Sequence, residues 1–400
     1  DIIQVIKIMN KTEIDKKLVQ IANTFCNEDF INTKTKNFLG DNSGTTLFLL
    51  YYNKYKSNKL IYNTAFSLFE KVAYVYNTLY SIAPSLSKFE WLVQHIKNNN
   101  LIEIESYNEE EQLVLNEYLY KEMVYYFKHD NIDFLHGGMG IGLYFVEIGY
   151  RKGIEELVKW LYNLSEKDPE GVKWLTITNF EKKTKAYSIS LSHGMSSVVA
   201  MLSKIYKTGV ELDKTKYMIE GAVNYILAQK LPEGKYNSIF PNFALESMES
   251  LSSSRLAWCY GDLGIAVALW QASQALGRKD WEQEVRDIML HASKRRNLQE
   301  NGVIDACFCH GTSGIAHIFK RMYHYTGMEE CKEAAEYWIE KTLEMARFED
   351  GAAGYKTWHG NDNGFEKEYG LLEGISGIGL VLLSYISDTE PVWDECLLLS

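Results

Sequence analysis

The sequence predicts an all-α fold, an α/α toroid, in which six helical hairpins close into a double-layered ring. Three observations predict it: a glycine-rich phrase that recurs six times, amphipathic stretches between the copies, and only 5 prolines in 400 residues. Scarce proline favours long uninterrupted helices, and an apolar period of 3.6 residues is typical of helices with one buried face. With 46% hydrophobic and 13% aromatic residues, the chain has enough apolar surface to exclude intrinsic disorder.

The recurring phrase consists of a small residue, two variable positions, a Gly or Ser, and a run of small and apolar residues. Its six copies begin at Asp41, Gly137, Gly194, Gly261, Gly311 and Gly374. We expect the leading glycine to form a sharp turn with a positive φ, and the second small residue to let an inner helix pack closely against a neighbour. The first copy departs from the others because Asp41 replaces the leading glycine.

Each interval between copies has room for two helices, an inner one rich in small residues and an amphipathic outer one. The clearest outer-helix patterns cover 62–79, 216–229, 281–292 and 330–345. The first interval is the longest, so we expect an insertion over 81–122 with its own loops. Ring closure removes the exposed ends that an open solenoid must cap. We therefore predict a single toroid domain over 1–400, with its glycine turns at one end of the ring.

The charge and cysteine content exclude several classes of protein. The chain carries 42 basic and 53 acidic residues, a net charge of −11, and so lacks the overall positive field of a nucleic-acid-binding protein. Its cysteines are too few and too unevenly spaced for a disulfide scaffold, which indicates reduced thiols and a cytoplasmic protein. No signal peptide is expected, and the apolar stretch 375–386 is too short to cross a bilayer.

Titratable side chains occupy five of the six positions directly before the turns, and the fold would bring these positions together. These positions hold Gly40, His136, His193, Tyr260, His310 and Glu373. Two turns also carry thiols, so Cys259, Cys309 and His310 offer two sulfurs and one imidazole nitrogen. This set favours Zn²⁺ with a fourth position left for water or substrate. Cys307 is a rival ligand, and we otherwise interpret Cys26, Cys307, Cys331 and Cys396 as small buried hydrophobes.

Three phrases together resemble the lanthipeptide cyclase family, the stand-alone LanC-type enzymes. They are Leu191-Ser-His193-Gly, Arg255-Leu-Ala-Trp258-Cys259-Tyr260-Gly261 and Cys309-His310-Gly311-Thr-Ser-Gly314, and the glycine repeats extend the similarity from about residue 40 to about residue 385. The resemblance implies an α/α toroid with one zinc ion at its mouth, held by Cys259, Cys309 and His310. It also implies that Asp133, His193, Arg255 and Tyr260 handle protons.

The resemblance implies a reaction and its partners as well. The reaction is the intramolecular addition of a peptide cysteine thiol to dehydroalanine or dehydrobutyrine, which forms a lanthionine or methyllanthionine thioether ring. The substrate would be a dehydrated precursor peptide, and the partners a separate dehydratase and a membrane transporter. The expected location is the cytoplasm, either free or at the surface of a membrane-bound biosynthetic complex.

This chemistry needs the residue types that are present. A free thiol has a pKa near 8.5, so zinc must deprotonate it to give the nucleophilic thiolate. Attack on the alkene forms an enolate, which Arg255 can stabilise and which then needs a proton. His193 has a suitable pKa to move that proton, and Asp133 can fix its tautomer. The sequence does not settle which residue protonates the enolate.

Simpler interpretations stand beside these roles. Asp133 could cap a helix, Arg255 could pair with Glu246 or Glu249 on the surface, and Tyr260 could line the cavity. We assign His136 and Glu373 structural roles, and we interpret His317, His324 and His359 as packing or surface residues. A zinc protein that binds a small thiol such as glutathione without making rings is the main alternative function. A glycosidase would need paired carboxylates at the mouth, and a helical scaffold would need no zinc ligands.

Overall fold

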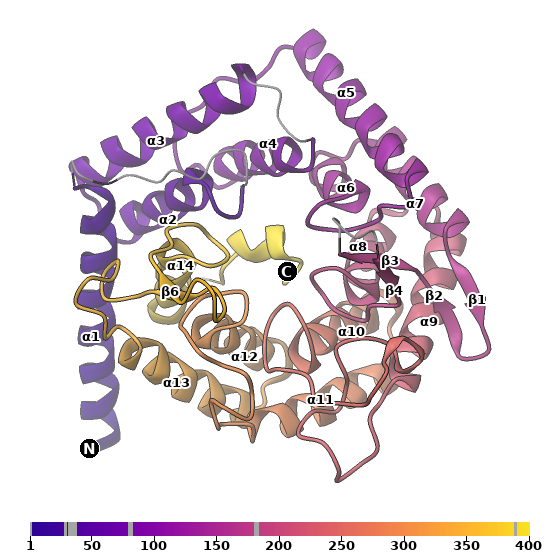
Figure 1. Ribbon diagram of the computed structural model, residues 1–400. Coiled ribbons are helices and arrows are strands. Elements are labelled where there is room, and N and C mark those ends of the chain that lie inside the picture. Colours follow the sequence, from indigo (N-terminus) through magenta and orange to yellow (C-terminus); the bar gives the residue numbers. More distant parts are fainter. Residues whose placement is uncertain (1, 28–29, 31–37, 79–82, 180–183, 388–389) are drawn as a thin grey trace. The chain divides into compact units, whose positions relative to one another are not determined.

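The structure is a computed structural model that describes residues 2–27, 30, 38–78, 83–179, 184–387 and 390–400 (Figure 1). The chain divides into two compact units. Unit 1 comprises 1–82, 95–103 and 303–393, and unit 2 comprises 83–94, 104–302 and 394–400. Helix α4 (Ala83–Asn98) and the 3₁₀ helix η2 (Trp393–Leu397) each run from one unit into the other. Neither unit is a continuous stretch of the sequence.

Unit 1 is built from three inner helices and their outer partners. The inner helices are α2 (Asn42–Tyr55), α12 (Thr312–Thr326) and α14 (Ile375–Ile386). Helix α14 packs against both α2 and α12 (Figure 1). The outer helices α3 (Lys59–Thr78), α13 (Glu329–Glu344) and α1 (Ile2–Phe25) cover α2, α12 and α14 respectively. A short antiparallel hairpin, β5 (Thr357–Trp358) with β6 (Phe365–Glu366), precedes α14.

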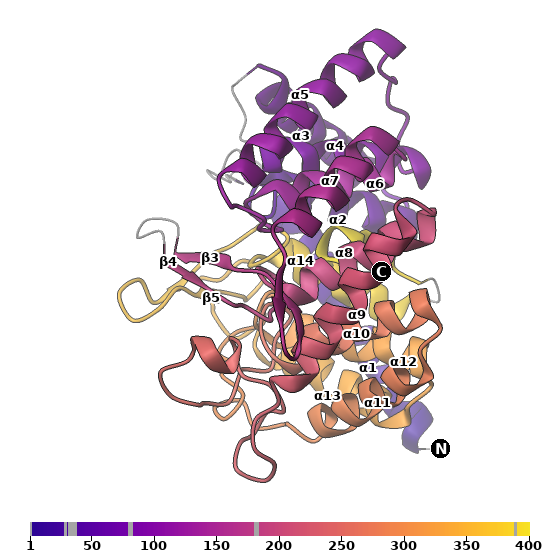
Figure 2. The ribbon, with the colours of Figure 1, turned by 90° about the vertical axis from the view of Figure 1, so that its right-hand side faces the viewer.

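Unit 2 repeats this arrangement. Its inner helices are α6 (Gly138–Glu147), α8 (Met195–Thr208) and α10 (Asp262–Leu276), and α8 packs against both of the others. Outer helices α5 (Glu109–Lys128) and α7 (Arg151–Asn163) cover α6, while α9 (Leu212–Ala228) covers α8 and α11 (Lys279–Ser293) covers α10. The remaining elements are η1 (Leu245–Ser247), the antiparallel pair β1 (Glu166–Asp168) and β2 (Gly171–Lys173), and the antiparallel pair β3 (Thr176–Asn179) and β4 (Thr184–Ala186), which Figure 2 shows from the side.

The inner helices form the core of each unit because most of their residues are buried. In α14, every residue except Tyr385 is buried, as is typical of a helix that is covered all round. Residues 394–400 return to the core of unit 2, where Trp258 Nε1 donates to Leu397 O at 3.0 Å and Gln271 Nε2 donates to Leu398 O at 2.8 Å. Among the described residues, no helix combines the length and apolar character needed to cross a membrane.

The predicted insertion over 81–122 is mostly helical. It begins at residues that lie outside the described ones, and continues through α4 and the larger part of α5. Helix α5 covers α6, so this part of the segment supplies an outer helix. The predicted outer helix over 62–79 corresponds to α3, and its last residue also lies outside the described ones. The single-domain assignment stays a prediction.

The leading glycines do not follow the expected backbone conformation. Five of them are the N-cap residues of α6, α8, α10, α12 and α14, but only Gly261 has a positive φ, of 91°. The prediction of positive φ is therefore wrong for the other four, and the physical reason for glycine is space. A Cβ would lie 2.3 Å from the carbonyl oxygen of Ser188 at Gly194, and 2.4 Å from the amide nitrogen of Cys307 at Gly311.

The second small residue meets the same restriction. A Cβ would lie 1.8 Å from the Phe308 carbonyl oxygen at Gly314 and 2.0 Å from the Leu371 carbonyl oxygen at Gly377. The loop before each inner helix therefore folds back onto the first turn of that helix. In α8 this position is Ser197, whose hydroxyl donates to Gly194 O at 2.6 Å. In the first copy, Asp41 caps α2 by accepting a hydrogen bond from the Ser43 amide at 2.7 Å.

We expect Gly314→Ala to destabilise the protein by about 1–3 kcal/mol, because overpacking outweighs the better helix propensity of alanine. Ser197→Ala is the matched control at the corresponding position of α8. It removes one hydrogen bond, worth about 1 kcal/mol, and introduces no close contact. Urea unfolding of both variants measures the difference. A Gly314→Ala protein as stable as the wild type would contradict the steric explanation.

Candidate functional site

The turns before α6 and α8 bring Asp133 and His193 into contact. Asp133 Oδ2 lies 2.6 Å from His193 Nδ1, and Asp133 Oδ1 accepts a hydrogen bond of 2.6 Å from the His136 amide. The Asp133 side chain is 1% exposed and that of His193 is 26% exposed. Asp133 is therefore not the N-cap of α6, a position that Gly137 occupies. One carboxylate oxygen of Asp133 thus holds the His193 imidazole in the turn before α8, and the other holds the His136 amide in the turn before α6.

The contact shifts the pKa values of both groups. Burial alone would raise the pKa of Asp133, but the hydrogen bond and charge of His193 outweigh it and lower that pKa below its usual value. Burial alone would lower the pKa of His193, but the hydrogen bond and charge of Asp133 raise it above 6.5. Asp133 is thus a carboxylate that holds Nδ1 of a readily protonated imidazole. Among the described residues, His193 Nε2 has no hydrogen-bond partner, so this nitrogen can accept or donate a proton.

Two rings flank His193. The His136 ring stacks on it with centroids 5.9 Å apart and an interplanar angle of 24°, and the Tyr260 ring lies 6.3 Å away. Burial lowers the pKa of His136 although the charge of Asp133 opposes this, so His136 is neutral beside its protonatable neighbour. The structure therefore brings the predicted Asp133, His193 and Tyr260 together, and adds His136, to which the sequence assigned only a structural role.

Cys259 belongs to the same region of unit 2. Its carbonyl oxygen accepts hydrogen bonds from the Ser192 amide at 3.3 Å and the Ser192 hydroxyl at 3.1 Å, so the residue next to His193 holds the turn that carries the thiol. Cys259 is 6% exposed. Burial lowers the pKa of His193, but Asp133 and, to a smaller extent, a charge on Cys259 raise it.

Arg255 is placed differently from the other predicted residues. Its side chain is exposed, and it makes no hydrogen bond or ion pair with any residue that the structure describes. The alternative of a surface pair with Glu246 or Glu249 is wrong, because no ion pair joins Arg255 to either residue in the described structure. Glu246 instead accepts hydrogen bonds from Lys173 at 2.7 and 2.9 Å. The guanidinium is thus available to a ligand, but the structure shows no contact between it and His193.

Sequence reasoning missed Lys88, a buried cation beneath this site. It lies on α4 and is 3% exposed, and its ammonium donates to Leu135 O at 2.8 Å and to Phe134 O at 3.4 Å. Burial lowers its pKa to about 8, although the charge of Asp133 opposes the shift. Lys88 therefore supports the loop that carries Asp133 and His136. The available signal was a lysine among apolar residues, in the segment Leu86-Ser-Lys88-Phe89-Glu-Trp91.

In unit 1, the turn before α12 carries a second group of polar residues. Asp305 is 2% exposed and accepts hydrogen bonds of 2.9 Å from the amides of both Cys307 and Trp358. Its Oδ2 lies 3.9 Å from His310 Nε2. One ligand atom each from Asp305, Cys307 and His310 lies within 4.8 Å of the others. Burial raises the pKa of the Cys307 thiol well above its usual value, which opposes its use as a thiolate.

The predicted zinc ligands are divided between the units. Cys309 and His310 directly precede the N-cap of α12 in unit 1, and the Cys309 amide donates to Leu372 O at 2.9 Å, which ties this turn to the one before α14. Cys259 is in unit 2. The complete ligand set therefore stays a prediction. All six cysteines are free thiols.

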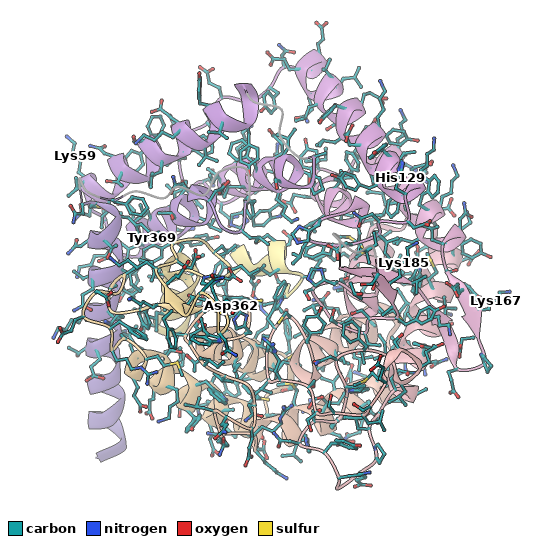
Figure 3. The ribbon with its side chains drawn as sticks, viewed as in Figure 1. Lys59, His129, Lys167, Lys185, Asp362 and Tyr369 are labelled. Atoms are coloured by element: carbon teal, nitrogen blue, oxygen red, sulfur yellow. The ribbon has the colours of Figure 1, made fainter. Side chains whose placement is uncertain are left out.

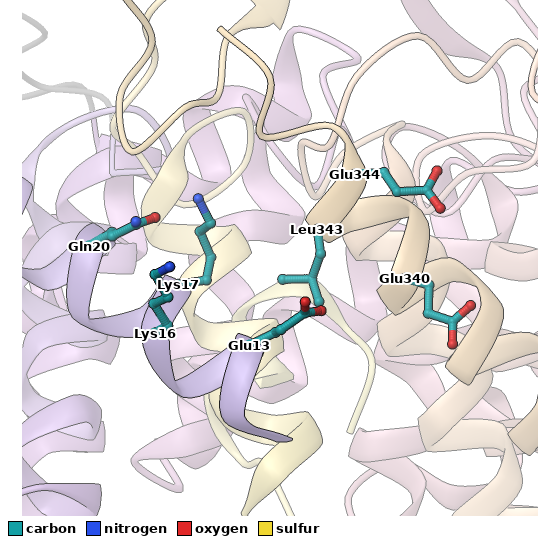
Figure 4. A pocket seen from close by; sticks show the side chains of 7 residues that line it. All are labelled: Glu13, Lys16, Lys17, Gln20, Glu340, Leu343 and Glu344. Carbon is teal, nitrogen blue, oxygen red and sulfur yellow. The ribbon is translucent and has the colours of Figure 1, made fainter. Parts of the chain in front are cut away.

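A cavity of about 510 Å³ in unit 1 lies away from these turns. Figure 4 shows Glu13, Lys16, Lys17 and Gln20 on α1 opposite Glu340, Leu343 and Glu344 on α13. Both lysines lie on α1, whereas the charged side chains of α13 are acidic. One lysine is already engaged, since Lys17 Nζ donates to Ala353 O at 3.0 Å. This cavity between outer helices has none of the groups that the predicted chemistry needs.

Comparison with known proteins identifies the family. The family model described as "Lanthionine synthetase C-like protein" matches residues 42–398, and the chain belongs to this family. It is similar to the nisin biosynthesis protein NisC of Lactococcus lactis subsp. lactis, with 30% identity over 149 residues, which are 36% of this chain and 31% of that protein. The solved structure of nisin cyclase matches with a TM-score of 0.71 and 18% identity over 97% of both chains. This match confirms the predicted α/α-toroid fold class.

In protein stripped of divalent metal, we expect His193 to titrate above pH 6.5, and Asp133→Asn to lower that pKa. The folded pKa is raised, so protonated His193 stabilises the fold fully below pH 6.5, and this contribution is lost as the pH rises through the folded pKa. NMR titration of the histidine ring signals measures the shift. Asp130→Asn is the control, because Asp130 pairs with Lys185. An unchanged His193 pKa in Asp133→Asn would rule out the ion pair.

Lys88→Met should have the opposite effect on His193. Its removal takes away a nearby positive charge that lowers the His193 pKa, so this pKa should rise above the wild-type value. The variant should also lose about 1–3 kcal/mol of stability, because two buried carbonyl oxygens lose a donor. The same NMR titration and urea unfolding test both effects, with the exposed Lys128→Met as control. A His193 pKa that stays constant or falls would contradict this role for Lys88.

Proposed function

We propose that this protein is a zinc-dependent lanthipeptide cyclase. It adds cysteine thiols of a dehydrated precursor peptide to dehydroalanine or dehydrobutyrine, and forms lanthionine and methyllanthionine rings. The observation that carries the proposal is the contact of 2.6 Å between Asp133 and His193, on a turn whose Ser192 also holds the turn of Cys259. Membership of the lanthionine synthetase C-like family and the similarity to NisC support it.

Cys259, Cys309 and His310 would hold the zinc ion. Two thiolates and one imidazole are a ligand set that zinc prefers, with one position open to a substrate thiol. Two features of unit 1 fit such a role. The first is that Cys309 is partly exposed. The second is that the Asp305 carboxylate lies 3.9 Å from His310 Nε2, and in a ligating histidine a carboxylate commonly contacts the ring nitrogen that does not bind the metal. Bound zinc would supply acidity, since it lowers the pKa of a coordinated thiol.

His193 would move the proton. Its Nε2 accepts the proton of the substrate thiol, and the Asp133 carboxylate stabilises the resulting imidazolium through Nδ1. The carbon–sulfur bond forms at the β-carbon while the alkene π electrons move onto the carbonyl as an enolate. The same imidazolium can return the proton to the α-carbon, so the addition needs no oxidant or reductant. His136 beside it is neutral and does not compete for the proton.

Arg255 and Tyr260 would act on the substrate. The exposed guanidinium of Arg255 can stabilise the enolate oxygen, a contribution of about 3 kcal/mol for a well-placed donor. The Tyr260 ring lies between His193 and Phe243, whose centroid is 5.9 Å away, and gives the peptide an apolar surface next to the imidazole. We also propose that a separate dehydratase supplies the substrate and that a membrane transporter exports the product, with the reaction in the cytoplasm or at a membrane-bound complex.

The test is to mix the purified protein with a dehydrated, uncyclised peptide and to count the remaining alkylatable thiols by mass spectrometry. Wild-type protein should consume thiols without a change in peptide mass, and His193→Ala should slow this by about 100-fold or more. Cys309→Ala should lose zinc and activity while it keeps its helical circular dichroism, whereas Cys331→Ala, a buried cysteine on α13, should keep both.

Two outcomes would overturn parts of this proposal. No thiol loss across several dehydrated peptides would instead favour a protein that binds a small thiol such as glutathione without making rings. Stoichiometric zinc in Cys309→Ala would show that the ligand assignment is wrong, and Cys307 would then be the first replacement candidate.

A further inference from the structure

Unit 1 contains another cluster of metal-ligating side chains, made of His359, Glu368 and Glu373. One ligand atom from each lies within 4.8 Å of the others, and His359 Nε2 is 3.0 Å from Glu368 Oε1. The sequence suggested only a packing or surface role for His359 and a structural role for Glu373. We propose that these three residues form a binding site for a first-row divalent cation such as Mn²⁺ or Zn²⁺, separate from the predicted cysteine ligands and independent of the cyclase proposal.

The backbone holds each of the three residues in place. The His359 amide donates to Gly364 O at 2.8 Å, which closes the loop between β5 and β6, where Figure 3 labels Asp362. The carbonyl oxygen of Glu368 accepts a hydrogen bond of 3.1 Å from Ile375, and that of Glu373 accepts one of 2.5 Å from the Thr357 hydroxyl. The hairpin and the start of α14 are therefore already linked, so a cation would find its ligands largely preorganised.

Two of the three side chains, those of His359 and Glu373, have ligand atoms without a hydrogen bond in the part of the chain that the structure describes. The Nε2 atom of His359 is buried and makes no hydrogen bond with the described residues, although Glu368 Oε1 lies 3.0 Å from it. Glu368 is 6% exposed, so its carboxylate is the most buried of the three ligand groups. The carboxylate of Glu373 makes no hydrogen bond or ion pair with the residues that the structure describes. A cation would use all three groups.

The donor set indicates which cations fit. One imidazole nitrogen and two carboxylates, with no thiolate, suit Mn²⁺, Fe²⁺ or Zn²⁺, and leave positions for water. The predicted cysteine site offers two sulfurs and should prefer softer ions. Mn²⁺ is therefore the probe that separates the two sites. Bound there, the cation would join the β5–β6 hairpin to the residue that precedes the N-cap of α14.

Equilibrium dialysis of the full chain against Mn²⁺ alone, followed by metal analysis and electron paramagnetic resonance, tests the proposal. Wild-type protein and Cys309→Ala should both bind one equivalent of Mn²⁺, so the result does not depend on the cysteine site or on cyclase activity. His359→Ala and Glu373→Gln should each weaken binding at least tenfold, while the control Glu366→Gln, an exposed residue on β6, should not. Circular dichroism checks that each variant is folded.

Two results would overturn the inference. One is the absence of Mn²⁺ binding to the wild-type protein. The other is Mn²⁺ binding that neither His359→Ala nor Glu373→Gln weakens. A Co²⁺ titration of Cys309→Ala gives a second measurement, because a site without sulfur should show no sulfur-to-cobalt charge-transfer band. Such a band in that variant would place the ion on thiols and not on this cluster.

Discussion

The contact on which the functional turns depend is the close approach of each loop to the helix that follows it. The carbonyl oxygen of Phe308 lies over Gly314, and that of Leu371 lies over Gly377, at distances that leave no room for a side chain. This restriction fixes the path of the chain just before each inner helix. The residues that carry chemistry occupy that path, so backbone packing places the turns that carry His193 and His310.

Charge compensation is the second organising feature, and it operates within unit 2. Asp133 is almost completely buried, yet its carboxylate stays ionised because His193 and the His136 amide supply hydrogen bonds. Lys88 adds a buried positive charge beneath the same loop and satisfies two carbonyl oxygens. Removing any one of these partners would leave a buried polar group without its hydrogen bond or counter-charge. This usually costs more stability than replacing both partners with apolar residues. The cluster is therefore best understood as one interacting set.

The sequence was sufficient for the features that repeat along the chain. The glycine phrases located five N-caps, and the phrase around His193 located a residue that meets Asp133 across 60 positions. The backbone conformation of those glycines was predicted wrongly, because both a positive φ and a lack of space select glycine and a sequence cannot separate them. Lys88 and the His359 cluster were missed for another reason. Their partners lie far along the chain or across a hairpin, and no local pattern records such contacts.

The division of the chain has a consequence for its synthesis. Residues 394–400 complete the core around Trp258, yet they follow all of the 303–393 segment that belongs to the other unit. Domains made from continuous sequence can fold one after another as they leave the ribosome. Here unit 2 gains the contacts of residues 394–400 only after segment 303–393 of unit 1 has been translated. A fragment that ends at residue 302 would therefore lack the hydrogen bonds that Leu397 and Leu398 accept from Trp258 and Gln271.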